Sequence, residues 1–179
     1  MHLRDSVLTS QLGETATAVG MAGIAGEIHV VISTNPEAGP RTLHTIRRAD
    51  GSWETLRIID RQVKPPRPDF FMQLYCAGAA GQLHICGVTG EGNILHTIRY
   101  PDGTWQNHWD DLKAILQPPP TGGPYPRIQC AGNDAGELLV TYQAGPLGAE
   151  TRVLYAFRNA NGFWTAPSSM DYFAILEMF

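Results

Sequence analysis

Hydrophobic and polar positions recur along this 179-residue chain with a period of about 50 residues. Each of three copies has four short stretches separated by turn residues, and the second stretch is apolar at successive positions. These second stretches are EIHVVIS (27–33), QLHICGV (82–88) and ELLVTYQ (137–143). A strand that is apolar on both sides is covered on both sides. The pattern predicts an all-β protein of three four-stranded sheets that share a core side by side, as β-propeller blades do.

A hairpin sequence recurs between the third and fourth stretches of each copy. The three versions are LHTIRRADGSW (43–53), LHTIRYPDGTW (95–105) and LYAFRNANGFW (154–164). Glycine after Asp or Asn accepts the positive φ that tight hairpin turns need, and we expect the fourth strand to begin at the tryptophan. Asp50 and Asp102 become Asn161 in the third copy. Because that exchange preserves a turn and deletes a carboxylate, we expect these residues to shape the turn and not to catalyse.

The repeats divide the chain into one domain with four parts. We expect a leading strand at 1–14, followed by repeats at 15–69, 70–126 and 127–179. The leading segment occupies the place of a fourth strand, so it is expected to complete or clasp a neighbouring blade. Proline-rich connections separate the repeats. The only helix candidate is DDLKAIL at 110–116.

Charge and composition exclude several classes of protein. A net charge of −4 and a pI near 5.8 leave no basic footprint for nucleic acid. The start of the chain lacks the apolar core of a signal peptide, and no apolar run approaches the roughly 20 residues of a membrane helix. We therefore expect a cytoplasmic protein with no membrane insertion. Its three cysteines form no CxxC motif and are expected to be structural thiols.

An arginine stands six residues before the hairpin tryptophan in every copy. In a hairpin with a three-residue loop, the two side chains face each other across the strand pair. An indole face and a guanidinium together suit a sugar, which stacks its C–H face on the ring and accepts hydrogen bonds at its hydroxyls. The same pair could instead seal one blade against the next. The candidate ligand-binding residues are Arg47 and Trp53, Arg99 and Trp105, and Arg158 and Trp164.

Histidines occur at two positions in each of the first two copies. His29 and His84 correspond to Leu139 in the third copy, so these positions are expected to face the core. The other position holds His44, His96 and Tyr155, which we keep as candidate ligand-binding residues.

Motifs for metal, cofactor or catalytic chemistry are lacking. His84 and Cys86 share a strand face, but two ligands without a third make a weak zinc signal. The chain has no HExxH, GxSxG or glycine-rich phosphate loop. Its paired carboxylates are Asp110 and Asp111, adjacent in sequence and absent from the other copies, so glycoside hydrolysis has no visible machinery. We expect no metal, no cofactor and no enzymatic activity.

The pattern G-x-L-H-V, then a loop, then L-H-x-x-R-x-x-D-G-x-W resembles the repeats of bacterial β-propeller proteins and propeller lectins of the tectonin-like and fucose-binding kinds. The resemblance covers residues 15–179, and its motifs specify a blade better than a ligand. Asp and Gly are adjacent in DGSW and DGTW, so the sialidase Asp-box is not met. The resemblance implies a lectin-like protein whose weak sites for a glycan or small sugar gain strength by avidity. A protein-interaction or structural scaffold without sugar binding is the alternative.

Three blades do not close a propeller ring by themselves. Short propeller lectins often close by oligomerisation, and a homodimer would give six blades without open edges. The alternative fold is a β-trefoil, which closes with three four-stranded repeats in a single chain, although these repeats are long for one and lack its Q-x-W pattern.

Overall fold

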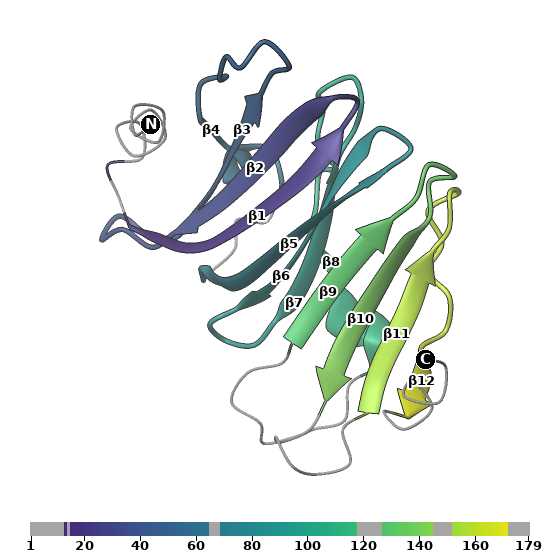
Figure 1. Ribbon diagram of the computed structural model, residues 1–179. Helices are drawn as coiled ribbons and strands as arrows, with labels where there is room; N and C mark the ends of the chain where they lie inside the picture. The colour runs from purple at the N-terminus through teal and green to yellow at the C-terminus, as the bar shows by residue number, and fades with distance from the viewer. Residues whose placement is uncertain (1–12, 14, 65–68, 118–126, 145–151, 172–179) are drawn as a thin grey trace.

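A computed structural model describes residues 13, 15–64, 69–117, 127–144 and 152–171 of the chain. These residues form three separate four-stranded antiparallel sheets, and each sheet consists of four strands that are consecutive in the sequence (Figure 1). We call the sheets blades 1, 2 and 3. Within each blade the strands are paired in chain order, from an inner strand to an outer one.

The strands have the following bounds. Blade 1 comprises β1 (Ala16–Ile24), β2 (Glu27–Thr34), β3 (Arg41–Arg47) and β4 (Arg57–Ile58). Blade 2 comprises β5 (Phe71–Ala79), β6 (Gln82–Thr89), β7 (Ile94–Arg99) and β8 (Asp110–Asp111). Blade 3 comprises β9 (Arg127–Gly132), β10 (Leu138–Ala144), β11 (Arg152–Arg158) and β12 (Ser168–Asp171). A 3-10 turn, η1 (Ile59–Arg61), follows β4, and a short helix, α2 (Leu112–Leu116), follows β8.

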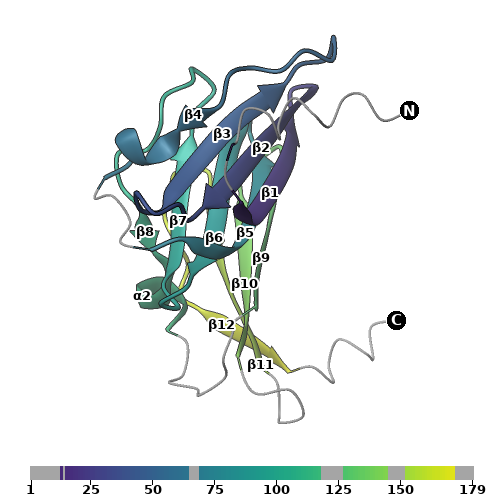
Figure 2. The ribbon, with the colours of Figure 1, turned by 90° about the vertical axis from the view of Figure 1, so that its left-hand side faces the viewer.

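The inner strands β1, β5 and β9 run alongside one another, while the outer strands lie away from this line (Figures 1 and 2). Small residues allow this close approach. A Cβ added at Gly78 would lie 3.0 Å from the Gly23 carbonyl oxygen, and one added at Gly132 would lie 2.4 Å from the Gly78 carbonyl oxygen. Glycine is therefore required where each inner strand meets the preceding one. Sheets stacked through their inner strands are propeller blades, and they exclude the β-trefoil, whose repeats share one barrel.

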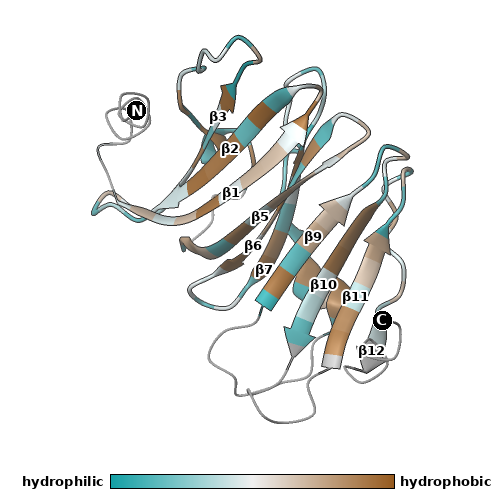
Figure 3. Ribbon diagram, in the orientation of Figure 1, coloured by the Kyte–Doolittle hydropathy of each residue, from teal (hydrophilic) through white to brown (hydrophobic). Residues whose placement is uncertain are grey.

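Two hydrophobic clusters fill the junctions between blades. The junction of blades 1 and 2 buries Ile24, Val31, Ile59, Val63, Phe71, Leu74, Leu83 and Ile85. The junction of blades 2 and 3 buries residues that include Cys86, Val88, Leu138 and Val140. Hydrophobic residues accordingly run along β2, β6 and β10 in Figure 3. The prediction of second strands covered on both sides is confirmed for β6, whose residues after Gln82 are all buried. Burial alternates along β10, where one side lacks a neighbouring blade in the chain.

The hairpins between third and fourth strands have a three-residue loop, the kind for which each arginine is expected from the sequence to face its tryptophan. The Arg48 amide donates to the Ser52 carbonyl and the Gly51 amide to the Arg48 carbonyl, both at 2.9 Å, and the same pattern recurs in blades 2 and 3. Asp50 Oδ1 accepts from the Ser52 amide and hydroxyl, so the prediction that it shapes the turn is confirmed. In blade 3 the turn acceptor is Asn159 and not Asn161.

The prediction that the fourth strand begins at the tryptophan is wrong. Each tryptophan makes one isolated bridge, and regular pairing resumes only at β4, β8 or β12. Between these points in blades 1 and 2, threonine hydroxyl groups donate hydrogen bonds to backbone carbonyl groups. Thr45 Oγ1 donates to the Glu54 carbonyl at 2.7 Å, and Thr97 Oγ1 donates to the His108 carbonyl at 3.2 Å. In blades 1 and 2 a side-chain hydrogen bond thus satisfies a backbone carbonyl where the regular strand pairing is interrupted.

The remaining predictions on chain organisation have mixed outcomes. The leading strand predicted at 1–14 lies outside the described residues except for Gly13 and is not assessed by the structure, and the repeat boundaries stay a prediction. The helix expected at 110–116 occurs as β8 followed by α2. Among the described residues, no helix has the length and apolar character needed to cross a membrane.

Candidate functional site

The hairpin places each candidate arginine opposite its tryptophan, as the sequence predicts. Arg47 pairs with Trp53, Arg99 with Trp105, and Arg158 with Trp164. Because paired residues project to the same side of a sheet, both side chains of each pair lie on one blade face.

The guanidinium groups of Arg99 and Arg158 lie over the glycines of their own hairpins. A Cβ added at Gly103 would lie 3.2 Å from Arg99 Nη2, and one added at Gly162 would lie 3.0 Å from Arg158 Nη2. Glycine therefore has two roles at these positions, since it leaves room for the guanidinium and also adopts the positive φ of the turn.

The tryptophans of blades 2 and 3 reach the preceding blade. The Trp105 ring meets the edge of His44 at a centroid distance of 5.4 Å and an interplanar angle of 82°. Trp164 meets His96 in the same way, at 5.4 Å and 88°. The Arg–Trp pair therefore lies at a junction between blades, where it borders a cleft formed by residues of both.

Cleft 2–3 lies between blades 2 and 3 and has a volume of about 600 Å³. It combines aromatic rings with carboxylate, amide, imidazole and guanidinium groups. Blade 2 supplies Tyr100, Trp105, Gln106, Asn107, His108 and Asp110, and blade 3 supplies Arg158, Gly162 and Trp164.

Cleft 1–2 is the equivalent space between blades 1 and 2, and its volume is only about 50 Å³. Its lining is His44, Glu54, Arg57, Ile59 and Gln62 together with Arg99, Gly103 and Trp105. The following blade supplies Arg, Gly and Trp to both clefts, so the difference between them comes from the preceding blade. There Glu54 and Arg57 stand where cleft 2–3 has Gln106 and Asp110. Arg48 also forms ion pairs with Glu54 and Glu27.

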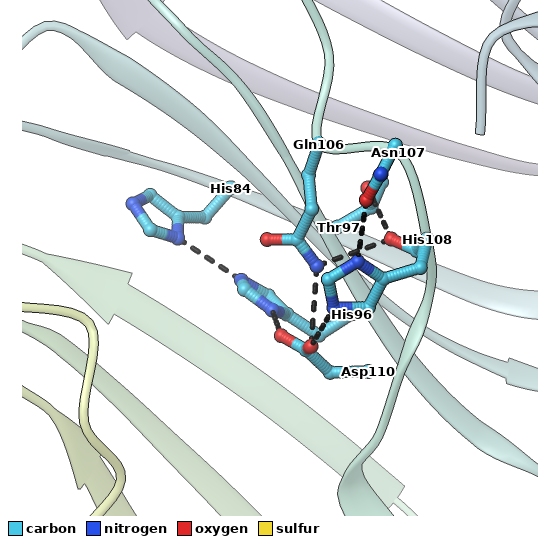
Figure 4. Close-up of polar contacts among 7 residues, drawn as sticks. All are labelled: His84, His96, Thr97, Gln106, Asn107, His108 and Asp110. Atoms are coloured by element: carbon cyan, nitrogen blue, oxygen red, sulfur yellow. Dashed lines mark hydrogen bonds and ion pairs between the residues drawn. The ribbon is translucent and has the colours of Figure 1, made fainter.

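A buried chain of hydrogen bonds ends at the Asp110 carboxylate (Figure 4). His84 Nδ1 lies 3.0 Å from His96 Nε2, and His96 Nδ1 lies 2.8 Å from Asp110 Oδ2. These residues come from β6, β7 and β8, and the sheet register puts them on the same face. Both imidazoles are buried, with exposed fractions of 1% for His84 and 0% for His96.

Asp110 accepts further hydrogen bonds at its other oxygen. Gln106 Nε2 and His108 Nε2 each lie 3.1 Å from Asp110 Oδ1. Burial raises the pKa of Asp110, but the hydrogen bond from His96 and the other donors outweigh it, so this pKa lies below its ordinary value. Burial lowers the pKa of His96 more than Asp110 raises it, and burial lowers the pKa of His84 to about 3. Asp110 is therefore ionised and both histidines are neutral at neutral pH.

These charge states determine which atom donates and which accepts in each hydrogen bond from His84 through His96 to Asp110. Ionised Asp110 accepts from His96 Nδ1–H, so neutral His96 presents an acceptor at Nε2. His84 must then donate from Nδ1, and its Nε2 carries a lone pair. That atom is buried and has no hydrogen-bond partner among the described residues. The chain holds Asp110 in a fixed orientation, with its carboxylate at the wall of cleft 2–3.

Two arginines in the clefts keep donors available. Within the described residues, neither Arg99 nor Arg158 makes a side-chain hydrogen bond or ion pair, and Arg158 Nε is buried without a partner. Burial lowers the pKa of Arg99, although Glu54 and Glu27 oppose this effect. A half-buried guanidinium without an acceptor is costly unless a ligand or water supplies one.

The structure unites some predicted site residues and separates others. His44 lies with Arg99 and Trp105 at cleft 1–2, and His96 lies behind Arg158 and Trp164 at cleft 2–3. His29 and His84 are buried, which agrees with their predicted core positions.

Arg47, Trp53 and Tyr155 lie apart from these two clefts. Arg47 and Trp53 occupy the face of blade 1 that has no preceding blade in the chain. Tyr155 packs edge-on against Phe157, at a centroid distance of 5.9 Å on the far face of blade 3. Ligand binding by these residues stays a prediction.

Sequence reasoning missed the polar residues of the preceding blade. Asp110 was discounted because the other copies lack it, yet it is the best-connected polar group of cleft 2–3. A signal existed in the position directly after the tryptophan, which is polar in every copy: Glu54, Gln106 and Thr165.

Metal and cysteine chemistry find no support in the described residues. No group of three or more metal-ligating side chains occurs among them, and Cys76, Cys86 and Cys130 are free thiols. Burial raises the pKa of both Cys76 and Cys86 well above the ordinary value, which disfavours reactive thiolates.

No protein-family model and no curated protein matches the sequence. Among solved structures, the chain is similar to an α-L-arabinofuranosidase from Podospora anserina in complex with cellotriose, at 14% identity and a TM-score of 0.49, over 88% of this chain and 52% of that one. It is also similar to the fucose-recognising, six-bladed β-propeller lectin of Aleuria aurantia, at 14% identity and a TM-score of 0.49, over 86% of this chain and 48% of that one. The chain spans about half the length of each. Its propeller architecture rests on its own three sheets.

Proposed function

We propose that this protein binds carbohydrate without transforming it, and that cleft 2–3 is its principal site. The observation that carries the proposal is the composition of that cleft. Two indole rings, Trp105 and Trp164, border a space of about 600 Å³ together with a guanidinium that has no hydrogen-bond partner among the described residues and an ionised carboxylate. Aromatic faces beside fixed donors and acceptors match the alternating C–H and hydroxyl surfaces of a sugar.

Each polar group of the cleft has a distinct part in this proposal. Arg158 would donate to sugar hydroxyls, since its guanidinium has donors and no acceptor capacity. Asp110 would accept from a hydroxyl, and the hydrogen bonds from His96, Gln106 and His108 keep the carboxylate in place for this. A neutral sugar suits the cleft better than an acidic one, because Asp110 would repel a second carboxylate.

The same groups favour binding over hydrolysis. Glycosidases use two carboxyl groups, one of which must be protonated to act as the general acid. Asp110 is the one carboxyl group among the described residues that line cleft 2–3, and its lowered pKa keeps it ionised. A chain with this lining would therefore hold a glycan and release it unchanged.

The proposal extends to a lectin-like mode of action. Single clefts would bind weakly, and several clefts would act together on a multivalent glycan. A homodimer with a six-bladed ring would multiply the sites and close the open sheets. The cytoplasmic location and the likeness to tectonin-like bacterial propellers stay predictions.

A glycan array followed by titration tests the proposal. Full-length protein is titrated with methyl glycosides of neutral hexoses and deoxyhexoses at millimolar concentration, and tryptophan fluorescence reports binding. Arg158→Ala is expected to lower the affinity by more than about tenfold, because a charged hydrogen bond contributes roughly 1.5 to 3 kcal/mol. Arg61→Ala is the matched control, since Arg61 lies on η1 and outside both clefts.

The outcomes distinguish sugar binding at the cleft from a scaffold function and from an enzymatic one. Loss of binding in Arg158→Ala with normal binding in Arg61→Ala supports the cleft. A wild-type protein that responds to no sugar on the array or in titration overturns it, and a stable protein partner captured under sugar-free conditions would then favour a scaffold. Release of reducing sugar from a bound glycoside would overturn the non-enzymatic assignment.

A further inference from the structure

Each blade packs on the preceding blade through one face, which we call its upstream face, and on the following blade through its downstream face. In blade 2 the upstream face carries Leu83 and Ile85, which are buried against blade 1. In blade 3 it carries Leu138 and Val140, buried against blade 2. The same two surfaces are thus used at both junctions of the chain, at equivalent positions of the sheets.

Among the described residues, the upstream face of blade 1 has no preceding blade, and part of it is exposed and apolar, while Val30 and Ile32 on the same face are buried against Trp53 and Leu56. Val19, Met21 and Ile28 are 50%, 64% and 41% exposed. Ile28 is the equivalent of Leu83 and Leu138, which are 1% and 0% exposed at the internal junctions. The hairpin pair of this face, Arg47 and Trp53, lacks the preceding blade that would form a cleft with it.

Gly23 gives a second and independent sign that this face is covered. It corresponds to Gly78 and Gly132, whose missing Cβ atoms leave room for the preceding inner strand. Among the described residues, no atom lies within 4 Å of a Cβ added at Gly23. Contacts within this part of the chain therefore do not require glycine at this strand position, whereas a preceding inner strand would require it as in blades 2 and 3.

The downstream face of blade 3 is the complementary open surface. It carries Leu139, Tyr155 and Phe157, and Phe157 is 41% exposed. The equivalent positions of blade 2 are His84, His96 and Ile98, all buried at the next junction. The three blades that the structure describes therefore leave one upstream face and one downstream face without a neighbouring blade, and these two faces are of the kinds that pack together at both internal junctions.

We infer that a second copy of this chain covers both faces, with blade 3 of each subunit packed on blade 1 of the other, and that this contact builds a third cleft across the two subunits. A twofold axis makes both contacts at once and leaves a closed ring of six blades. In each composite cleft one subunit supplies Arg47 and Trp53. The opposite wall is formed by Tyr155 of the partner subunit, Thr165 of the partner subunit and Ser168 of the partner subunit.

The equivalences define the chemistry of this composite cleft. Arg47 and Trp53 correspond to Arg158 and Trp164 of cleft 2–3. Thr165 and Ser168 occupy the places of Gln106 and Asp110, and Ser168 pairs with Tyr155 as Asp110 pairs with His96. The cleft would thus offer hydroxyl groups and one cation but no carboxylate, which suits a neutral sugar. The choice of ligand rests on the proposed function, whereas the subunit contact does not.

The first experiment measures mass. Light scattering of the full chain is expected to give about 39 kDa, twice the 19.6 kDa of one chain. Gly23→Gln is expected to give a folded monomer, because an added Cβ has room among the described residues, whereas the side chain would block a second inner strand. Ala114→Gln, at an exposed position of α2, is the matched control and is expected to remain a dimer. A monomeric wild type overturns the inference, as does a Gly23→Gln variant that is as fully dimeric as the control.

The second experiment follows each indole by fluorine NMR of protein labelled with 5-fluorotryptophan, with signals assigned by single Trp→Phe variants. The Trp53 signal is expected to shift between wild type and Gly23→Gln, while the Trp164 signal stays in place. On addition of the neutral methyl glycosides, Trp164 should respond in both proteins and Trp53 only in wild type.

Each failure in that second experiment has a separate meaning. A dimer in which Trp164 responds to sugar and Trp53 does not overturns the composite site alone. A dimer in which no tryptophan responds overturns the proposed function and the ligand of the third cleft, while the subunit contact stands. An unchanged Trp53 signal in Gly23→Gln overturns the placement of Trp53 at the contact.

Discussion

Cleft 1–2 and cleft 2–3 have the same frame and differ twelvefold in size, about 50 Å³ against about 600 Å³. In both, the following blade presents an arginine over a hairpin glycine beside a tryptophan, and that tryptophan meets a buried histidine of the preceding blade. The difference lies in two positions of the preceding blade. Glu54 and Arg57 flank the small cleft, and Gln106 and Asp110 flank the large one.

The comparison separates the residues that build a blade from those that make a site. The repeated Arg, Gly and Trp are dictated by the hairpin and the junction, so they recur whether or not a space opens beside them. The residue paired with the buried histidine determines the charge of the cleft and the space that is left in it. At this position Arg57 has a long, positively charged side chain, whereas the side chain of Asp110 is short and is hydrogen-bonded to His96.

Removing the Asp110 carboxylate is expected to have the largest effect. Asp110→Ala leaves the His96 Nδ1–H buried without an acceptor, so the free energy of unfolding should fall by about 2 to 3 kcal/mol. Sugar affinity at cleft 2–3 should fall by more than about tenfold. Urea unfolding and fluorescence titration measure the two effects.

The control for this variant is Arg57→Ala at the equivalent position of cleft 1–2. Arg57 is exposed and its loss leaves no buried group unpaired, so the cost should stay within about 0.5 kcal/mol. Equal losses of stability in the two variants would mean that the clefts do not differ as the structure indicates.

Acid is expected to destabilise both blades that carry paired histidines. Burial lowers the pKa of His44 and of His84 to about 3 in the folded protein, whereas the unfolded chain binds protons below about 6.5. The unfolded state therefore binds more protons between these values, and stability is lost as the pH falls from about 6.5 toward 3. At pH 5.5 the loss should be about 1 kcal/mol for each histidine.

Leucine variants test this assignment, because the third copy has Leu139 where the first two have His29 and His84. His84→Leu is expected to weaken the dependence of unfolding free energy on pH between 7 and 5, as measured by urea unfolding at each pH. A slope identical to that of the wild type would show that His84 is protonated equally in the folded and unfolded chains.

Arg57→Asp is expected to make cleft 1–2 resemble cleft 2–3. Burial is the main cause of the low pKa of His44, and the nearby cations, Arg57 among them, lower it further. The variant replaces one cation by a carboxylate at the position paired with His44, so the pKa of His44 should rise. Histidine NMR during a pH titration measures this change, and a Trp105 fluorescence response to sugar would show that the cleft has opened. A His44 pKa that stays the same or falls contradicts the role given to this position.

The fold could be predicted from the sequence because repetition and turn chemistry agree. Three hairpins with Asp-Gly or Asn-Gly turns and apolar second strands specify blades; the three hairpins form, and the second strand of blade 2 is buried on both sides, whereas burial alternates along β10. The start of the fourth strand was misplaced because Thr45 and Thr97 replace backbone pairing by side-chain hydrogen bonds. Both threonines recur in the repeated LHTIR sequence, but this repetition does not reveal that their side chains replace backbone pairing.

The candidate site could be predicted only in part. Arg99, Trp105, Arg158 and Trp164 were found because repetition marks them, and they do border the clefts. Asp110 was missed because it occurs in one copy only, and repetition does not mark residues that differ between copies. Its importance arises from packing, which brings β6, β7 and β8 together and aligns His84 and His96 behind it.

The smallest expected effect concerns the hairpin glycines, which the two clefts share. Gly103 and Gly162 have φ of 90° and 88°, so alanine at either position should cost about 1 kcal/mol in the free energy of unfolding. The added Cβ would also press on Arg99 Nη2 or Arg158 Nη2. Because only cleft 2–3 has room for a sugar, Gly162→Ala should weaken sugar binding a few-fold and Gly103→Ala should leave it unchanged. A larger loss of affinity in Gly103→Ala than in Gly162→Ala, measured by the same fluorescence titration, would place the principal site in cleft 1–2.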